Sequence, residues 1–407
     1  MNKWEACPLG DMISLKRGYD LPHRERVNGK FPIVSSSGIS GFHKEAKVKG
    51  PGVVTGRYGT LGEVFYIPEN FWPLNTSLYV QDFKGNSPRF ISYFLQTLGL
   101  DSQNIAGAVP GVNRNALHKL MVRKPPLSVQ RKISAVLSAY DDLIENNARR
   151  IALLERMAEG IYREWFVRLR FPGHEQAAFH KGIPAGWEGT SLGGLLDIKH
   201  GYAFKGEFFS TEPTENILLT PGNFAIGGGY KDDKLKYYSG PIPEDYILES
   251  GDMILTMTDL SKAGDTLGYP AFVPPSSEYK FLHNQRLGKV LIYDKTIAGK
   301  HFLYYIFCSE QYRYHVVGSA TGATVKHTAP ERIKSFQILL PPQGIVQRFE
   351  EQADVLRNQI VLLSRKSQLH RANARSHPHS PNLWQTLRRR PDIQFPPSMA
   401  AEAPYDG

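Results

Sequence analysis

Two stretches of this chain repeat apolar residues at the alternating steps of four and three that are typical of coiled-coil helices. The first lies in the middle of the chain, within residues 127–170, and its seam is nearly unbroken over five heptads. The second lies within residues 343–375. Because an isolated helix gains little stability from propensity alone, each stretch needs a partner along its seam. The sequence therefore predicts two long helices that pack on each other.

The residues of this seam are mostly apolar, and the polar Asn147 is expected to set the register of the pair. The predicted seam consists of Ile133, Leu137, Tyr140, Ile144, Asn147, Ile151 and Leu154 in the first helix and Phe349, Ala353, Leu356, Ile360 and Leu363 in the second. Ser367 and His370 replace apolar residues farther along the second helix, which is the weaker of the two. The alternative is that each helix packs only on its own domain. The length of the first seam favours an antiparallel intramolecular coiled coil.

The segments that precede the two helices also repeat. Residues 4–19 (WEACPLGDMISLKRGY) and residues 187–202 (WEGTSLGGLLDIKHGY) match at seven positions with an offset of 183. Each copy leads to Pro-Pro, at residues 125–126 and 341–342, shortly before a heptad helix. The interiors between these anchors differ, and the second is about thirty residues longer. This pattern predicts two modules with one scaffold, different surfaces and a pseudo-twofold relation.

The predicted fold class is α+β, with two α/β domains separated by two long helices that form the antiparallel coiled coil. Each module is rich in glycine, proline and aromatic residues between short apolar runs. The predicted boundaries are a first domain at 1–126, a central helix at 127–170, a linker at 171–186, a second domain at 187–342, a distal helix at 343–375, and a basic, disordered tail at 376–407.

Net charge points to a polyanionic partner. The formal charge of +10 favours nucleic acid over an anionic membrane. The two cysteines, Cys7 and Cys308, have neither metal-ligand nor disulfide-framework spacing. The N-terminus lacks the apolar core of a signal peptide, and no run approaches the length of a membrane span. A cytoplasmic protein is expected.

Motifs for catalysis are missing from the sequence. We find neither a phosphate-binding G-x-x-x-x-G-K-[ST] loop nor an Asn-Pro-Pro-Tyr or Asp-Pro-Pro-Tyr run. The paired acids at 141–142, 232–233 and 350–351 are expected on solvated faces, and His377 and His379 have no third ligand nearby. The sequence thus predicts a non-catalytic chain with no cofactor, no metal and no small-molecule substrate.

The ordered set of these segments resembles the specificity subunit of type I restriction–modification systems, over residues 1 to about 370. The resemblance is carried by SSSGISGFHKEAKVKGPGVVTGRYGTLGEVFYI (35–67), VNRNALHKLMVRKPPLSVQRKISAVLSAYDDLIENNARRIALLERM (112–157), YREWF (162–166) and TAPERIKSFQILLPPQGIVQRFEEQADVL (328–356). Two features depart from the family. Val129-Gln130 and Val346-Gln347 stand where Glu-Gln is usual after Pro-Pro, and the tail is rich in proline.

The resemblance implies that the two domains are target-recognition domains that read a bipartite target on double-stranded DNA. The coiled coil would fix the spacing between the two half-sites. Two methyltransferase subunits would dock on the helices and restriction (translocase/endonuclease) subunits would join them, so that the methyl donor and ATP belong to those partners. The alternative from another class is a coiled-coil adaptor that joins proteins without binding DNA. An enzyme with an unrecognised site is a third.

Contacts to DNA are expected from basic, amide and aromatic side chains in loops at strand ends, because these reach phosphates and base edges. In the first module the candidates are Lys44, Lys47, Lys49, Arg57, Tyr58, Asn113, Arg114 and Asn115. In the second module they are Lys234, Lys236, Tyr237, Tyr238, Thr258, Lys262, Asn284, Gln285, Arg286, Lys326 and His327. The clusters 113–115 and 284–286 are expected to correspond to each other. For each candidate the alternative is a solvated surface or turn residue.

Overall fold

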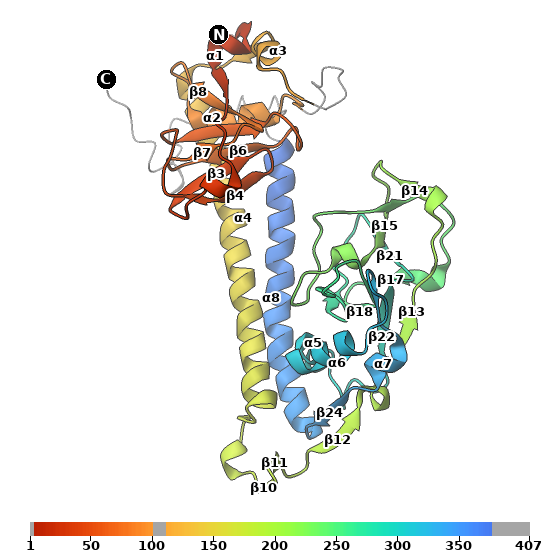
Figure 1. Ribbon diagram of the computed structural model, residues 1–407. Helices are drawn as coiled ribbons and strands as arrows, with labels where there is room; N and C mark the ends of the chain where they lie inside the picture. The colour runs from red at the N-terminus through yellow and green to blue at the C-terminus, as the bar shows by residue number, and fades with distance from the viewer. Residues whose placement is uncertain (1–3, 101–110, 377–407) are drawn as a thin grey trace. The chain divides into compact units, whose positions relative to one another are not determined.

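The computed structural model describes residues 4–100 and 111–376, which form two compact units (Figure 1). Unit 1 comprises Met1–Asn147 with Lys366–Gly407, and unit 2 comprises Ala148–Arg365. Each unit therefore contains one module and a part of both long helices. Among the described helices, none has the length and apolar character needed to cross a membrane. The predicted tail lies outside the described residues apart from its first position, Ser376, which is the last residue of a helix.

The first module is built on a four-stranded antiparallel sheet in the order β2-β8-β5-β6. A three-stranded sheet, β4-β3-β7, and the pair β1-β9 complete it. Its strands are β1 (Glu5–Pro8), β2 (Ser14–Arg17), β3 (Phe31–Ser35), β4 (Gly38–His43), β5 (Gly52–Gly56), β6 (Val64–Ile67), β7 (Trp72–Pro73), β8 (Ser77–Asp82) and β9 (Met121–Lys124). Its helices are α1 (Leu9–Met12), α2 (Pro88–Gln96) and α3 (Arg114–His118), with a 3₁₀ turn at His23–Glu25.

Strand β5 explains how the two sheets of this module share a core. All five of its residues are buried. Successive side chains of a strand point to opposite faces, so both faces of β5 must be covered. Val53 belongs to a cluster with Phe90 and Ile91 of α2, whereas Val54 packs with Val34 of the three-stranded sheet. Strand β5 is thus covered on both sides, including at the polar Thr55.

The second module has the same four-stranded sheet, here in the order β13-β22-β18-β20. Its strands are β12 (Glu188–Ser191), β13 (Leu196–His200), β14 (Phe209–Ser210), β15 (Asn216–Leu219), β16 (Tyr237–Tyr238), β17 (Ile247–Leu248), β18 (Met253–Thr256), β19 (Thr258–Asp259), β20 (Pro270–Phe272), β21 (Lys280–His283), β22 (Leu287–Ile292), β23 (Lys326–His327) and β24 (Gln337–Leu340). Its α-helices are α5 (Lys300–Cys308), α6 (Glu310–Gly318) and α7 (Pro330–Lys334). Short 3₁₀ turns lie at Leu192–Gly194, Gly206–Phe208, Pro221–Asn223 and Glu244–Tyr246.

The repeat in the sequence corresponds to a repeat of strand pairing in the two modules. The pair β1-β9 corresponds to β12-β24, and the parallel pair β3-β7 corresponds to β15-β21. Gly18 and Gly201, which match in the repeat, are needed for the same reason in both copies. A Cβ atom at Gly18 would lie 2.1 Å from the carbonyl oxygen of Leu74, and one at Gly201 would lie 2.0 Å from that of Asn284. The repeated glycines therefore mark one close approach between strand β2 or β13 and the turn before β8 or β22.

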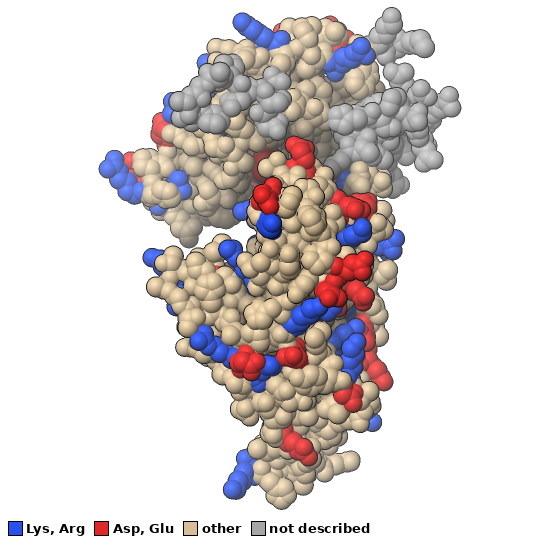
Figure 2. Space-filling model, turned by 90° about the vertical axis from the view of Figure 1, so that its right-hand side faces the viewer, with Lys and Arg blue, Asp and Glu red and all other residues tan. Residues whose placement is uncertain are grey.

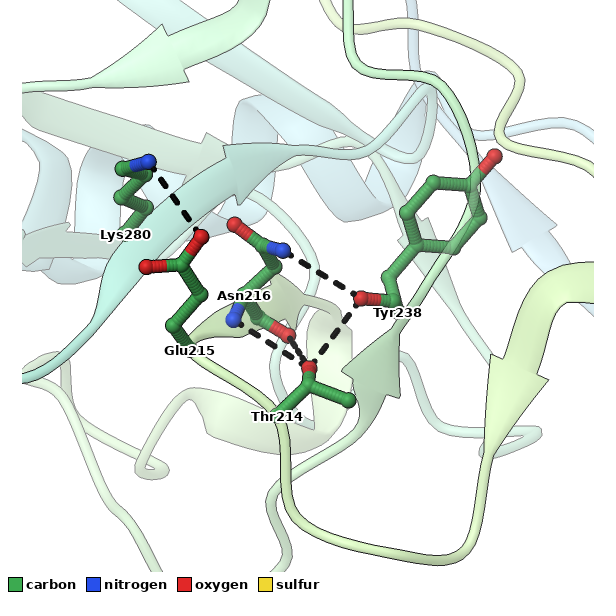
Figure 3. A network of polar contacts seen from close by, with 5 residues as sticks. All are labelled: Thr214, Glu215, Asn216, Tyr238 and Lys280. Atoms are coloured by element: carbon green, nitrogen blue, oxygen red, sulfur yellow. Dashed lines mark hydrogen bonds and ion pairs between the residues drawn. The ribbon is translucent and has the colours of Figure 1, made fainter.

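The longer interior of the second module widens its second sheet to five strands, in the order β14-β16-β15-β21-β17. Thr214 fixes β16 beside β15, because its hydroxyl lies 3.1 Å from the carbonyl oxygens of both Asn216 and Tyr238 (Figure 3). At the surface of the same region the ammonium group of Lys280 lies 3.4 Å from a carboxylate oxygen of Glu215. These contacts hold the backbone of β16, so the side chains of that strand have fixed directions.

The two long helices are α4 (Leu127–Tyr162), which ends in a π-helical turn at Arg163–Val167, and α8 (Gln343–Ser376). Between α4 and the second module lie a 3₁₀ turn at His174–Gln176 and the short pair β10 (Phe179–His180) and β11 (Ile183–Pro184). In unit 2 the ring of Tyr162 lies 6.1 Å from that of Phe349, and in unit 1 the ring of Tyr140 lies 5.8 Å from that of His370. The helices are therefore antiparallel.

Every predicted seam residue is buried or half-buried, and the predicted antiparallel coiled coil is confirmed. Ser367 is also buried, so the seam continues through this polar position. Ile133 and Leu137 lie in the core cluster of the first module as well. The packing of each helix on its own module, which the sequence offered as the alternative, therefore occurs together with the coiled coil.

Each long helix also anchors the N-terminus of a short helix of its module. In unit 1 the buried Gln130 accepts a hydrogen bond from the backbone N–H of Ser87, the N-cap of α2, at 3.0 Å. In unit 2 Glu350 accepts hydrogen bonds from the backbone N–H groups of His301 and Phe302, at 3.1 and 2.8 Å. Glu350 was predicted on a solvated face, and this was wrong, because its carboxylate satisfies the first donors of α5.

Candidate nucleic-acid interface

In the first module, segments that are far apart in the sequence meet at one edge of the four-stranded sheet. Strand β2 ends there at Arg17, β5 ends at Gly56 and β8 begins at Ser77. The segment before α3 crosses the same edge, where the backbone N–H of Val112 donates to the carbonyl oxygen of Arg57 at 3.0 Å. Loop residues on three strand ends and one crossing segment are thereby brought together.

A pocket of about 520 Å³ lies at this edge. Its lining residues are Arg17, Arg57, Tyr58, Leu78, Gly111, Val112, Asn113, Arg114 and Asn115. Five of them were predicted from the sequence, and the structure brings these five together from two separate segments. Arg17 was missed, although the repeat carried a signal: KRGY and KHGY differ only at this residue, directly before a glycine that the scaffold requires.

The pocket has a cationic and amide character. Among the residues that the structure describes, three arginines line it and no acidic residue does. The guanidinium of Arg57 lies 4.5 Å from the ring centroid of Tyr58, a cation–π contact that restricts its position. Asn113 is the N-cap of α3 and accepts a hydrogen bond from the N–H of Asn115 at 2.9 Å. Guanidinium and amide groups in one concave site suit phosphate oxygens and base edges.

The three predicted lysines of this module lie outside the pocket. Lys44, Lys47 and Lys49 are exposed in the connection between β4 and β5. Lys44 forms an exposed ion pair with Glu45 at 3.6 Å, and the ammonium group of Lys47 lies 4.9 Å from the ring centroid of Trp72. They are exposed but do not line the pocket, and their contact with a polyanion stays a prediction.

The same edge of the second module gathers residues from three predicted segments. Strand β13 ends there at His200, and the N–H of Met257 donates to the carbonyl oxygen of Arg286 at 2.9 Å. Strands β19 and β23 pair beside it, which places Lys326 opposite Asp259 and His327 opposite Thr258. Lys262 follows β19 and is exposed, as are Gln285 and Arg286.

Three predicted contact residues of the second module are parts of the scaffold. Tyr238 is only 2% exposed and packs with Phe204 and Leu282. Thr258 is buried, with its hydroxyl 3.1 Å from Nδ1 of His327. Asn284 is buried, and its side-chain oxygen accepts a hydrogen bond from the N–H of Arg286 at 2.9 Å. Residue type alone indicated polarity and did not reveal that these groups face inward.

The clusters 113–115 and 284–286 do not correspond to each other. The turn at 284–286 precedes β22 and is equivalent to residues 74–76, which precede β8, because Gly201 and Gly18 approach the two turns in the same way. Residues 113–115 begin α3, whose counterpart α7 begins after Ala329 with Pro330 and Glu331. The two modules therefore build one edge from different residues.

Lys234, Lys236 and Tyr237 lie in and beside strand β16, which pairs with β15 as β4 pairs with β3. Lys234 is exposed, whereas Lys236 and Tyr237 are half-buried. The ammonium group of Lys236 lies 3.7 Å from the ring centroid of Phe209. Burial, together with the charge of nearby Arg286, lowers the pKa of Lys236. Two cations near each other favour an anion as their ligand.

Charge on the face drawn in Figure 2 is mixed, because basic and acidic side chains alternate among uncharged ones. The positive net charge therefore does not gather into one broad patch on this face. No group of three or more His, Cys, Asp or Glu side chains within residues 4–100 and 111–376 is arranged to hold a metal ion. The arginine pocket is a local concentration of positive charge.

Comparisons with known proteins agree on one family. The family model of the type I restriction modification DNA specificity domain matches residues 1–156. The type I restriction enzyme MjaIX specificity subunit of Methanocaldococcus jannaschii is 25% identical over 317 residues, which cover 71% of this chain and 67% of the relative. The MjaVIII specificity subunit of the same organism is 23% identical over 366 residues, covering 83% and 82%.

A solved structure shares the fold over nearly the whole chain. The crystal structure of the type I restriction–modification S subunit from M. genitalium matches with a TM-score of 0.55 and 13% identity. The match covers 97% of this chain and 98% of that one.

Proposed function

We propose that this chain, which belongs to the family of type I restriction–modification specificity subunits, reads a bipartite target on double-stranded DNA and directs partner subunits to it. The observation that carries the proposal is the repeated sheet edge. One scaffold presents Arg17, Arg57 and Arg114 at this edge in the first module, and Arg286 and Lys326 in the second.

The first half-site would be read at the arginine pocket. Arginine makes paired hydrogen bonds to guanine in the major groove and to phosphates, and asparagine does the same with adenine. Arg57 is held against Tyr58, and the Asn113–Asn115 bond fixes the start of α3. Side chains that are oriented before binding lose less entropy when they bind, which favours specific contacts over diffuse attraction.

The second half-site would be read with different residues at the equivalent edge. Lys262, Arg286 and Lys326 supply charge there, while His200 and Met257 stand at the positions of Arg17 and Arg57. Different side chains on one scaffold give each module its own base preference. The lengths of α4 and α8, continuous helices of 36 and 34 residues, would set the number of unread base pairs between the half-sites.

Partner subunits would dock on the long helices. Val355, Leu362 and Leu369 repeat every seven residues on α8 and are exposed, away from the seam. Exposed apolar side chains in such a stripe are typical of a protein interface. Methyltransferase subunits would bind there and restriction subunits would join them, while this chain itself performs no catalysis. The same stripe would suit the alternative, a coiled-coil adaptor without DNA binding.

Selection of duplexes from a randomised DNA library by the purified full chain tests the proposal. Arg57→Ala with Arg114→Ala should weaken binding of the selected duplex at least about tenfold, since each good arginine contact is worth about 1–3 kcal/mol. The control is Arg24→Ala, because Arg24 lies outside the pocket with a side chain 85% exposed. Wild-type affinity should fall as salt rises. A chain that selects no sequence and shows no salt-dependent retention would favour the adaptor.

A further inference from the structure

The loop at residues 259–266 of the second module holds an apolar side chain away from the protein. Leu260 is 66% exposed, although the preceding Asp259 is only 4% exposed. A single exposed leucine on a protein surface needs no explanation by itself. Leu260 differs from an ordinary exposed leucine because hydrogen bonds fix the conformation of its loop.

A buried carboxylate organises the loop. Asp259 accepts hydrogen bonds from the N–H of Ser261 at 2.6 Å and from the hydroxyl of Thr266 at 2.7 Å, and from the N–H of Thr266. The hydroxyl of Ser261 accepts a hydrogen bond from the N–H of Asp265 at 2.8 Å. Burial disfavours the ionised form, but these hydrogen bonds outweigh it and keep the pKa of Asp259 below its ordinary value. The loop thus has one preferred conformation around an ionised side chain.

The loop is also fastened to the rest of the module. Arg313 of α6 donates to the carbonyl oxygen of Gly264 at 2.7 Å. Immediately after the loop, Leu267 is fully buried and the N–H of Gly268 donates to the carbonyl oxygen of Thr256 at 2.9 Å. Both ends and the middle are therefore fixed, and Leu260 is presented in a defined position.

The corresponding loop of the first module has a different structure. Between β5 and β6 its leucine, Leu61, packs against the core, and two glycines with positive φ, Gly59 and Gly62, shape the turn. The outward leucine is consequently a feature of the second module and not of the shared scaffold.

Two lysines of this edge are near Leu260 in the sequence or in the strand pairing, and the same loop also carries the exposed Asp265. Lys262 is exposed two residues later, and Lys326 pairs across from Asp259 in the β19-β23 ladder. Lysines flanking a fixed apolar side chain match the surface of a DNA groove, in which phosphates border base edges. In the major groove the 5-methyl group of thymine is the apolar feature that such a side chain reads.

We propose that Leu260 contacts the 5-methyl group of a thymine in the second half-site and so helps to determine its sequence. This inference rests on the proposed function. The loop supplies Leu260 in a fixed position, and Lys262 and Lys326 contact the adjacent phosphates. A leucine in this role discriminates thymine from cytosine, which lacks the methyl group.

The test begins with the duplex that the full chain selects from a randomised library. Each thymine of the second half-site is replaced in turn by deoxyuridine, which removes only the methyl group. One replacement should weaken wild-type binding about fourfold, the value of one buried methyl group. Leu260→Ala should bind the original duplex about as weakly and should be insensitive to that replacement. Ile226→Ala is the control, because Ile226 is also exposed in this module and should leave the thymine dependence unchanged.

Several results would overturn the inference while leaving the proposed function intact. These are a selected second half-site without thymine, wild-type binding that ignores every deoxyuridine, and a Leu260→Ala chain that keeps the thymine dependence. A Leu260→Ala chain that binds DNA normally but loses the methyltransferase subunit would identify the loop as a protein contact instead. Failure to select any DNA would defeat both proposals together.

Discussion

Replacement of Gln130 by leucine should loosen the attachment of α2 to α4. Gln130 is 1% exposed and satisfies three partners at once. Its amide nitrogen donates to the side-chain oxygen of Asn86 at 2.7 Å and to the carbonyl oxygen of Pro125 at 2.9 Å, and its oxygen accepts from the N–H of Ser87 at 3.0 Å. Leucine has a similar size but leaves all three groups buried without this partner.

The expected loss follows from those three groups. A buried polar group left unpaired costs about 1–3 kcal/mol. Asn86 keeps the hydrogen bond that its amide nitrogen donates to the carbonyl oxygen of Met12 at 2.8 Å, but its side-chain oxygen loses the Gln130 partner. We therefore expect Gln130→Leu to lower the local free energy of opening by about 3–5 kcal/mol, less than the sum of three full penalties. Counted from the Pro-Pro pairs, the residue of α8 at the place of Gln130 is Val346, which is fully buried, so the scaffold itself tolerates an apolar residue there.

Hydrogen exchange of the full chain measures this loss where it occurs. In Gln130→Leu the amides of α2 should exchange at least about 100-fold faster, because each 1.4 kcal/mol is a factor of ten. Arg131→Leu is the matched control, since Arg131 is the next residue of α4 and is exposed. Exchange rates in α2 that match those of the control would show that the Gln130 network does not stabilise this junction.

Three further perturbations test other parts of the structure. Asp259→Asn should lower the free energy of unfolding above about pH 4 and should make that free energy less dependent on pH in the acidic range. The folded pKa of Asp259 is lowered, so its contribution is present above the ordinary value of 3.8 and is lost as pH falls through the folded pKa; thermal unfolding across pH measures this. Asn147→Leu should stabilise the coiled coil while relaxing its register, which circular dichroism melts and cross-linking of the two helices would show. Insertion of one heptad in both α4 and α8 should lengthen the unread spacer of the DNA target by about three base pairs, since seven helical residues span about 10 Å; library selection with the lengthened chain measures the spacer.

Periodicity and repetition carried the most reliable part of the sequence interpretation. The heptad seam, including Asn147, is sheltered along both helices because a one-dimensional pattern of period 3.5 maps onto one helix face. Gly18 and Gly201 repeat because a carbonyl oxygen excludes any larger residue at both positions. Such constraints act locally, and a single sequence displays them directly.

Whether a polar side chain in a short strand points inward or outward could not be predicted from the sequence in this way. Tyr238 and Thr258 were expected at the surface and lie inside, because whether a residue of a two-residue strand faces in or out depends on its partners across the sheet. Leu260 was overlooked for the opposite reason, since an apolar residue in a loop suggests core packing. Five residues of the arginine pocket were predicted from residue type and Arg17 was missed, because the convergence of Arg17 and Arg114, 97 positions apart in the sequence, depends on contacts between distant segments.

Each long helix packs on the other long helix and also on its own module. This double packing affects the stability of a chain in which one module is exchanged. On α8 the seam residues Ala353 and Ile360 pack toward the coiled coil, whereas Glu350, Asp354 and Arg357 serve the second module. Glu350 binds backbone N–H groups, which any replacement module with a helix at this position would supply. Asp354 instead depends on a side chain, Nε2 of His301 at 2.8 Å.

Arg357 likewise depends on side chains of the module. Its guanidinium lies 5.0 Å from the ring centroid of Phe272, and burial lowers the pKa of this arginine despite the opposing effect of Tyr304 and Glu155. An exchange of residues 187–342 alone would leave Asp354 and Arg357 facing foreign side chains. The Asp354 side chain is 47% exposed, so the larger loss is expected at Arg357, because an uncompensated buried charge is strongly destabilising. Transferring residues 354 and 357 with the donor module should restore the thermal stability that the simple exchange loses. If the simple exchange is as stable as the parent chain, the two charged residues do not tie α8 to its module.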